Sequence, residues 1–229
     1  MRFSNKTIVI TGGASGIGAA TAEKCRAEGG KVVVLDRAEA DVSDESQVQA
    51  FFASLKGPIH ALVNSAGVAV RKTVIDQDVE SWDRVMAVNV KGSYLCSKYA
   101  APRMKPSGGA IVHLSSVVGL TGVRNRAAYS TSKGAIVALT RNMAMDLSGD
   151  KIRVNCVCPG FTRTPFTAGL LSDPEKEAKL LALHPLGRLG EAIDIANAIA
   201  FLISGEASWI TGQAIAVDGG FTAGHGVDV

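Results

Sequence analysis

Short hydrophobic runs alternate with amphipathic stretches along the whole chain. Runs such as KVVVL at residues 31–35 are apolar at nearly every position, which is typical of parallel strands covered on both faces. The expected strands are Thr7–Thr11, Lys31–Leu35, His60–Val63, Ala110–Leu114, Ile152–Val157 and Ala214–Val217. The expected helices are Ile17–Ala27, Ser46–Leu55, Ser81–Met104, Ala127–Leu147 and Ala192–Ile203. This alternation predicts an α/β fold with a doubly wound parallel sheet, and residues 1–229 are interpreted as a single domain.

The segment after the second expected strand is unusually short. Only four residues separate Asp36 from Asp41, whereas a parallel crossover needs about a dozen residues and usually contains a helix. The third strand unit is therefore predicted to be shortened or missing. We expect a sheet of six main strands, with the second strand at or near one edge.

Composition and charge narrow the classes of function. The formal net charge is only +3 and no block of Lys and Arg occurs, so a nucleic-acid partner is not indicated. No apolar stretch approaches the ~18 residues needed to cross a bilayer, and the N-terminal apolar run is too short for a signal peptide. We therefore expect a cytoplasmic protein, in which the four cysteines are buried, reduced thiols.

A glycine-rich turn follows the first strand and leads directly into a helix. Glycines at such a turn let the backbone approach a pyrophosphate, and the N-terminus of the helix favours its charge. The spacing is not G-x-G-x-x-G, because the glycines of the motif fall at 12, 16 and 18. The candidate dinucleotide-binding residues of this loop are Gly12, Ser15, Gly16, Ile17 and Gly18.

An acidic residue at the end of the second strand favours NAD over NADP. The carboxylate of Asp36 can accept hydrogen bonds from the adenosine ribose and repels a 2′-phosphate. Position 15 is Ser, so the loop offers no cation for that phosphate. The neighbouring Arg37 leaves NADP open as the less favoured cofactor, since it could either receive the phosphate or lie in solvent.

The pair Tyr129 and Lys133 has the i, i+4 spacing of one helical face. A tyrosine of pKa ~10 is a poor base at neutral pH, and lowering its pKa to ~7 requires about 4 kcal/mol of preferential phenolate stabilisation. A nearby ammonium and an oxidised nicotinamide can together provide it. We therefore predict that Tyr129 transfers the proton.

The spacing alone is weak evidence, because Tyr94 and Lys98 repeat it, with Ser81 lying 13 residues upstream of Tyr94. Ser81 stands in a polar stretch that predicts the start of a helix. Ser116 also lies 13 residues before its tyrosine, Tyr129, but it follows a strand, where parallel sheets bind ligands. Tyr129 is therefore interpreted as functional, and Tyr94–Lys98 as a structural pair on a packing helix.

Taken together, the motifs resemble the single-domain short-chain dehydrogenase/reductase family. They are TGGASGIG, NSAG at residues 64–67, VNVKG around Asn89, Ser115-Ser116, Tyr129 with Lys133, and Pro159-Gly160. The resemblance extends to HPLGRLGEAIDIANAIAFL and ITGQAIAVDGG near the end of the chain. It implies a Rossmann-like fold, a nicotinamide cofactor, a small-molecule alcohol or ketone substrate and a homotetramer.

The resemblance also implies roles for individual residues. Ser116 would hold the substrate carbonyl, Lys133 would bind the nicotinamide ribose and lower the Tyr129 pKa, and Asn89 would anchor a water of the proton relay. Asn89 could instead satisfy backbone groups in a kinked helix. The other residues implied to contact the cofactor are Asp41, Val42, Asn64, Ala66, Gly67, Pro159, Gly160, Thr162 and Thr164.

Several residues keep two interpretations. The segment at about 164–190 is predicted to form a substrate lid, with an apolar face made by Phe166, Leu170 and Leu171. Arg71, Arg124 and Arg126 could recognise an anionic substrate or lie in solvent.

The histidines match no metal motif, so no metal site is predicted. His113 is expected in the core, and His184 could face the substrate. The four histidines of the chain are His60, His113, His184 and His225.

The sequence thus predicts an NAD(H)-dependent oxidoreductase that interconverts a secondary alcohol and a ketone. A second hypothesis is an NADPH-dependent 3-oxoacyl thioester reductase, against which Asp36 and Ser15 argue. A third is a non-catalytic nucleotide-sensing protein with the same fold, against which the set Asn89, Ser116, Tyr129 and Lys133 argues.

Overall fold

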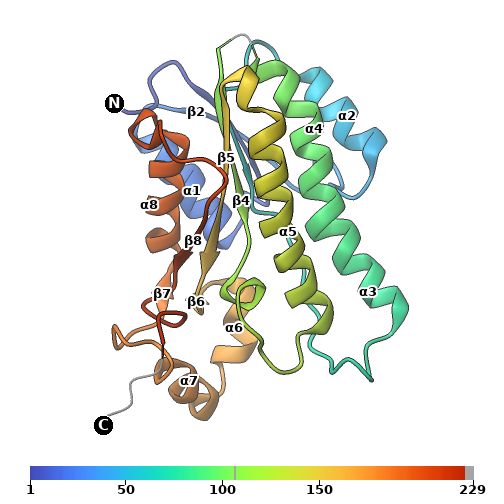
Figure 1. Ribbon diagram of the computed structural model, residues 1–229, viewed down its shortest axis with the longest axis vertical. Coiled ribbons are helices and arrows are strands. Elements are labelled where there is room, and N and C mark those ends of the chain that lie inside the picture. The colour runs from blue at the N-terminus through green and yellow to red at the C-terminus, as the bar shows by residue number, and fades with distance from the viewer. Residues whose placement is uncertain (106, 225–229) are drawn as a thin grey trace.

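A six-stranded parallel sheet forms the centre of the molecule, with the strand order β2-β1-β3-β4-β5-β8 (Figure 1). The computed structural model describes residues 1–105 and 107–224. The strands are β1 (Thr7–Thr11), β2 (Lys31–Leu35), β3 (Ala61–Asn64), β4 (Gly109–Leu114), β5 (Ile152–Pro159) and β8 (Ala214–Val217). The predicted Rossmann-like, doubly wound fold is confirmed.

Helices cover both faces of the sheet (Figure 1). On one face lie α1 (Gly16–Ala27) and α8 (Ala192–Ile203); on the other lie α2 (Glu45–Ser54), α4 (Gly92–Met104) and α5 (Ala127–Asp146). Alternate residues of a strand enter different cores: Val9 packs in the core on the α2 and α4 side, whereas Ile8 and Ile10 pack in the core beside α1 and α8. Burial of both faces explains why the strands read as continuous apolar runs.

The third strand unit is missing, as predicted. After Asp36 the chain turns at once, and the backbone N–H groups of Glu39 and Ala40 both donate to the Asp36 carbonyl at 3.0 Å. Asp44 then caps α2 by accepting from the backbone N–H of Gln47. Strand β2 is left at the edge of the sheet, paired with β1 alone.

The helix predicted over Ser81–Met104 differs from the observed one. It consists of α3 (Val79–Met86), a π-helical turn (Ala87–Lys91) and α4. It begins two residues earlier than predicted because the Asp78 carboxylate caps it, accepting from the backbone N–H of Ser81 at 2.8 Å. The π-helical turn contains Asn89, and π-helical turns are frequent at functional sites.

The segment after β5 forms two short helices at the lower end of the molecule in Figure 1. They are α6 (Pro165–Leu171), capped by Thr164 and Thr167, and α7 (Pro174–Leu181), capped by Asp173. Two-residue strands β6 (Thr162–Arg163) and β7 (Gly190–Glu191) pair at the base of this segment. The remaining short turns are 3-10 helices at Val117–Gly119, Ser148–Asp150 and Gly205–Ala207.

Two further expectations concern cysteines and membranes. All four cysteines are buried and free, as predicted. In the part of the chain that the structure describes, no helix has the length and apolar character that a bilayer span requires.

Candidate active site

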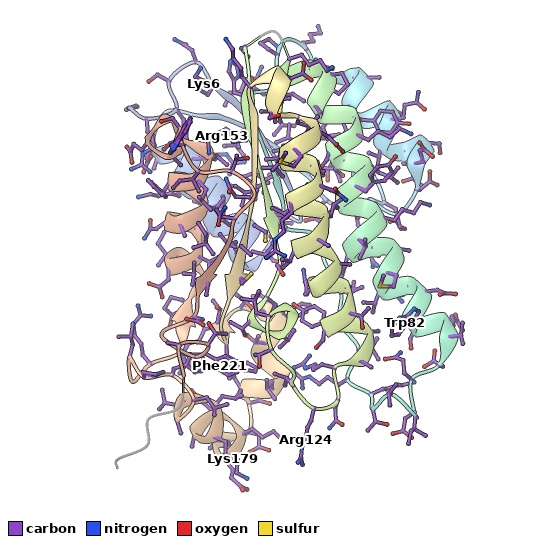
Figure 2. The ribbon with its side chains drawn as sticks, in the orientation of Figure 1. Lys6, Trp82, Arg124, Arg153, Lys179 and Phe221 are labelled. Carbon is purple, nitrogen blue, oxygen red and sulfur yellow. The ribbon has the colours of Figure 1, made fainter. Side chains whose placement is uncertain are left out.

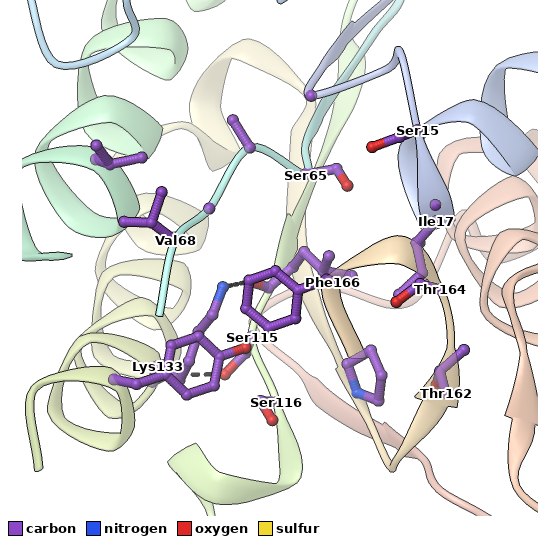
Figure 3. Close-up of a pocket in the computed structure, with 18 of the residues that line it drawn as sticks. Ser15, Ile17, Ser65, Val68, Ser115, Ser116, Lys133, Thr162, Thr164 and Phe166 are labelled. Atoms are coloured by element: carbon purple, nitrogen blue, oxygen red, sulfur yellow. Dashed lines mark hydrogen bonds between the residues drawn. The ribbon is translucent and has the colours of Figure 1, made fainter. Parts of the chain in front are cut away.

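A cavity of about 300 Å³ opens where the strands of the sheet end. In Figure 3, Ser15 and Ile17 lie at one side of it, and Ser116 and Lys133 lie at the other. Most of the predicted site residues line this cavity: Gly12, Ser15, Gly16, Ile17, Asp36, Arg37, Asp41, Val42, Ala66, Gly67, Ser116, Tyr129, Lys133, Pro159, Gly160, Thr162 and Thr164. Three do not line it, namely Gly18, Asn64 and Asn89, which are buried.

The glycine-rich loop needs its glycines for close packing. Gly12 has φ +65°, and a Cβ there would lie 2.8 Å from the backbone of Ala66. A Cβ on Gly18 would lie 2.1 Å from the carbonyl oxygen of Gly12, so Gly18 fixes the helix against the loop rather than facing the cavity. The Thr11 hydroxyl accepts from the backbone N–H groups of Ser65 and Ala66, both at 3.1 Å. Side chains at Gly12 and Gly18 would therefore push the loop away from Ala66 and from the start of α1, the helix N-terminus that favours a pyrophosphate.

The end of β2 places a carboxylate beside this loop. The oxygens of Asp36 accept from the backbone N–H groups of Ala14 at 3.0 Å and Arg37 at 2.9 Å. A carboxylate has about four lone-pair positions, so Asp36 can still accept from a ribose. Asp41 lies nearby, and its pKa is lowered chiefly by the hydroxyl and the backbone N–H of Ser43. This end of the cavity carries two carboxylates beside the exposed Arg37.

Lys133 lies almost fully buried on α5, with 4% of its surface exposed. Its ammonium donates to the carbonyl of Leu114 at 2.6 Å, and its Nζ lies 5.5 Å from the centre of the Tyr129 ring. Burial lowers the pKa of Lys133 to about 8. The Ser115 hydroxyl donates to the Lys133 carbonyl at 2.8 Å and so fastens α5 to the end of β4.

Tyr129 lies one turn before Lys133 on the same helix. Burial raises the pKa of Tyr129 to about 12, while the Arg126 guanidinium and the Ser116 hydroxyl act in the opposite direction. The Arg126 guanidinium carbon lies 5.9 Å from the ring centre. The structure therefore brings Ser116, Tyr129 and Lys133 together at one cavity wall, as predicted.

Asn89 holds the loop after β3 against α5. Its side-chain oxygen accepts from the backbone N–H of Val68 at 2.8 Å, and its amide donates to the Val68 carbonyl at 2.9 Å and to the Ser132 hydroxyl at 3.0 Å. Asn89 thus satisfies backbone groups, as the alternative interpretation held, but these groups belong to the loop after β3 and not to its own helix. A role in a proton relay stays a prediction.

Asn64 and His113 form a buried polar pair beneath the cavity. The Asn64 amide donates to the Ser97 hydroxyl at 3.0 Å and pairs with His113 Nδ1 at 3.1 Å. His113 is fully buried, as expected of a core histidine, but its Nε2 has no partner among the described residues. Burial, assisted by the charge of Lys133, lowers the pKa of His113 to about 3.

This shift predicts acid sensitivity of the fold. The pKa of His113 is about 3 when folded and ~6.5 when unfolded, so the unfolded state binds the proton first and stability falls as pH drops below about 6.5. The expected loss is about 2 kcal/mol between pH 6.5 and 5. Urea unfolding of wild type and His113→Asn at several pH values measures it, and equal slopes in the two proteins would contradict the prediction.

The second Tyr-x-x-x-Lys motif has no role at the cavity. Tyr94 is 47% exposed on α4, and Lys98 pairs with Glu45 at 2.7 Å. The tyrosine that shares Glu45 with Lys98 is Tyr99, at 2.9 Å. Both residues lie on α4 outside the cavity, but the expected structural pair is wrong: among the described residues Lys98 pairs with Glu45 on α2, and not with Tyr94.

No histidine of the described residues lines the cavity that contains Tyr129. His184 is buried; its Nδ1 lies 2.7 Å from the Leu180 carbonyl, and its Nε2 accepts from the backbone N–H of Phe161 at 3.3 Å. It lines a second cavity rather than the one with Tyr129, so the idea that it faces the substrate there is not supported. No cluster of metal-ligand side chains occurs within residues 1–105 and 107–224. His225 lies outside the described residues.

Sequence reasoning missed most of the apolar lining. Phe166, predicted for the lid, lines the cavity, and its ring centre lies 6.0 Å from that of Tyr129; Leu170 and Leu171 do not line it. No local pattern marks the remaining lining residues, because their exposure to the cavity depends on the fold. They include Leu35, Ala40, Val68, Val88, Val117, Val118 and Phe161.

Known proteins resemble the chain over almost its whole length. A family model described as short chain dehydrogenase matches residues 6–42, and one described as Enoyl-(Acyl carrier protein) reductase matches residues 37–222. 2-(S)-Hydroxypropyl-CoM dehydrogenase 3 of Xanthobacter autotrophicus is 43% identical over 97% of this chain and 98% of its own length. Cis-4-hydroxycyclohexanecarboxylate dehydrogenase of Sinomonas cyclohexanicum is 39% identical over 96% and 98%.

The fold comparison agrees with the sequence comparison. A Beutenbergia cavernae protein solved with bound NADP has a TM-score of 0.91 and 31% identity, over 96% of this chain and 98% of that one. The relatives are named as dehydrogenases of alcohols, and the cavity combines a nucleotide-type glycine loop with a Tyr–Lys–Ser wall. The chain belongs to the short-chain dehydrogenase/reductase family, which binds nicotinamide cofactors.

Proposed function

We propose that this protein is an NAD(H)-dependent oxidoreductase that interconverts a secondary alcohol and a ketone, with Tyr129 as the acid/base. The observation that carries the proposal is the convergence of Asp36, the glycine-rich loop and the Ser116–Tyr129–Lys133 group on one cavity. The names of the relatives, which specify a hydroxypropyl compound and a hydroxycyclohexanecarboxylate, support an alcohol as the substrate.

The chain's residues fit a dinucleotide. Backbone groups of the loop that contains Gly12 and Gly16 would hold the pyrophosphate, Asp36 the adenosine ribose, and Lys133 the nicotinamide ribose. Thr162 and Thr164 line the same cavity and would hold the carboxamide. When bound, the nicotinamide supplies the acceptor or donor of hydride.

The catalytic residues would act on the alcohol proton. Ser116 orients the substrate oxygen by a hydrogen bond, and the Tyr129 phenolate accepts the hydroxyl proton during oxidation. Because burial holds the pKa of Tyr129 near 12 in the free protein, deprotonation at neutral pH requires added positive charge. Lys133 contributes it as the ammonium form, which dominates below its pKa of about 8.

Comparing NADH with NADPH tests the cofactor assignment. We expect nicotinamide fluorescence titrations to give a Kd for NADH at least about tenfold below that for NADPH, because the Asp36 carboxylate repels a 2′-phosphate. NAD-coupled turnover of secondary alcohols then tests the activity. Absence of binding by either dinucleotide would refute the proposal.

Reduction with NADPH is the second candidate. The family model that matches residues 37–222 is described as Enoyl-(Acyl carrier protein) reductase, and the Beutenbergia cavernae structure contains NADP. Tighter binding of NADPH than NADH in the same titration would favour this reading and would mean that Arg37 receives the 2′-phosphate. A homotetramer and a cytoplasmic location stay predictions, to be tested by light scattering and by fractionation.

A further inference from the structure

Arg126 is a charged residue at the cavity wall without an acceptor. It lines the cavity, is partly buried, and lies over the ring of Tyr129. Among residues 1–105 and 107–224, no carboxylate or carbonyl pairs with its guanidinium. Its 5.9 Å approach to the Tyr129 ring is near the ~6 Å limit of a cation–π contact and occupies none of its five N–H donors.

Other partly buried arginines of the chain provide an internal comparison. Arg103 donates to three backbone carbonyls and Arg153 donates to two. This is the usual arrangement, because removing a charged group from water is costly unless its donors are satisfied. Arg126 differs from these two arginines, and it lines the cavity that contains Tyr129.

A second cation, Arg71, strengthens the positive potential around Arg126. Arg71, in the loop after β3, is exposed, and its charge acts together with burial to lower the pKa of Arg126. No carboxylate in the described part of the chain forms a salt bridge with either arginine. Two neighbouring cations without a counter-ion attract an anion, and a planar guanidinium suits a carboxylate through two parallel hydrogen bonds.

We propose that Arg126, with Arg71 behind it, binds the carboxylate of the substrate, which is therefore a hydroxy acid. The hydroxyl group would face Tyr129, and the carbon skeleton would lie against the apolar side chains of Phe166 and Val118, which line the same cavity. The inference rests on the proposed function and specifies its substrate class.

The test compares matched substrates. Cis-4-hydroxycyclohexanecarboxylate and 3-hydroxybutyrate are each assayed against their primary amides, and kcat/KM is measured for wild type and Arg126→Met. We expect the acid-to-amide ratio of kcat/KM to fall about 30-fold in Arg126→Met, mainly through KM. The ratio removes any effect of Arg126 on the pKa of Tyr129, since acid and amide need the same proton transfer. Arg126→Lys is expected to restore part of the preference, and Arg71→Met to reduce it about threefold.

Arg124 is the matched control. It lies in the same loop, but it is exposed and projects from the lower end of the molecule (Figure 2), so Arg124→Met should leave the ratio unchanged.

Calorimetric binding of cyclohexanecarboxylate to wild type and Arg126→Met provides a readout that does not need turnover. Equal binding, or equal ratios, in the two proteins would overturn the inference. If the enzyme oxidises neutral alcohols such as 2,3-butanediol and shows no preference for acids over their amides, the inference is overturned but the proposed function stands. Carboxylate binding that depends on Arg126, without turnover of any alcohol, would support the subsite and refute the proposed function.

Discussion

Tyr129→Phe is expected to lower kcat for alcohol oxidation by at least about 1,000-fold while changing the Kd for NADH by less than about threefold. The substitution removes only the phenolic hydroxyl, and general acid–base catalysis contributes about 10²–10⁴-fold. The ring, which packs 6.0 Å from that of Phe166, is retained. Steady-state kinetics and a fluorescence titration on the same preparation measure both quantities.

The chain contains a matched control for this experiment. Tyr94→Phe changes the other Tyr-x-x-x-Lys motif, whose tyrosine is 47% exposed on α4 and lies outside the cavity. It should keep wild-type kcat. In wild type, kcat/KM for oxidation should rise with pH, because Tyr129 must lose its own proton before it can accept the hydroxyl proton of the substrate. Comparable kcat values in wild type and Tyr129→Phe would exclude Tyr129 as the acid/base.

Asp36→Ala is expected to change cofactor preference by about 100-fold in favour of NADPH. The variant loses a charged acceptor for the ribose hydroxyls, worth about 1.5–3 kcal/mol, and it loses the charge that repels a 2′-phosphate. The variant also loses the hydrogen bond that the backbone N–H of Ala14 donates to the Asp36 carboxylate at 3.0 Å. NADH binding is therefore expected to weaken as well. Titrations with NADH and NADPH measure the ratio of the two Kd values.

Two further variants separate the causes of this change. Asp83→Ala removes an exposed carboxylate on α3 and should leave the ratio unaltered, which excludes an effect of net charge. Asp36→Ala combined with Arg37→Ala should lose much of the gained NADPH affinity if Arg37 receives the phosphate. An unchanged ratio in Asp36→Ala itself would remove the basis for choosing NAD.

The sheet and the cofactor end of the site were predictable because their signals are local. A glycine that must approach another backbone, such as Gly12, or a carboxylate at the end of a strand, such as Asp36, is recognised from its neighbours in sequence. The missing third strand unit followed from chain length alone, since four residues cannot make a parallel crossover.

The substrate end was less predictable because it is assembled from distant segments. Arg126 is only three residues before Tyr129, but Phe166 lies 37 residues after it, and only the fold brings the Phe166 ring to Tyr129. For His113, the sequence indicated burial but not the unpartnered Nε2, which depends on how the neighbouring elements of the fold meet around it. Hydrophobic periodicity could not reveal the π-helical turn, because one extra residue in a turn has no characteristic composition.

That π-helical turn at Ala87–Lys91 acts as a one-residue shift in helical phase. Successive residues of an α-helix are rotated by about 100°, so an inserted residue turns everything after it by that angle relative to everything before it. The shift therefore separates the helical phase of α3 from that of α4, and it falls at Asn89, which bonds both backbone groups of Val68. Deleting one residue here would leave the composition nearly unchanged and yet rotate one of the two helices out of alignment, so chain length within this helix is constrained as tightly as residue identity.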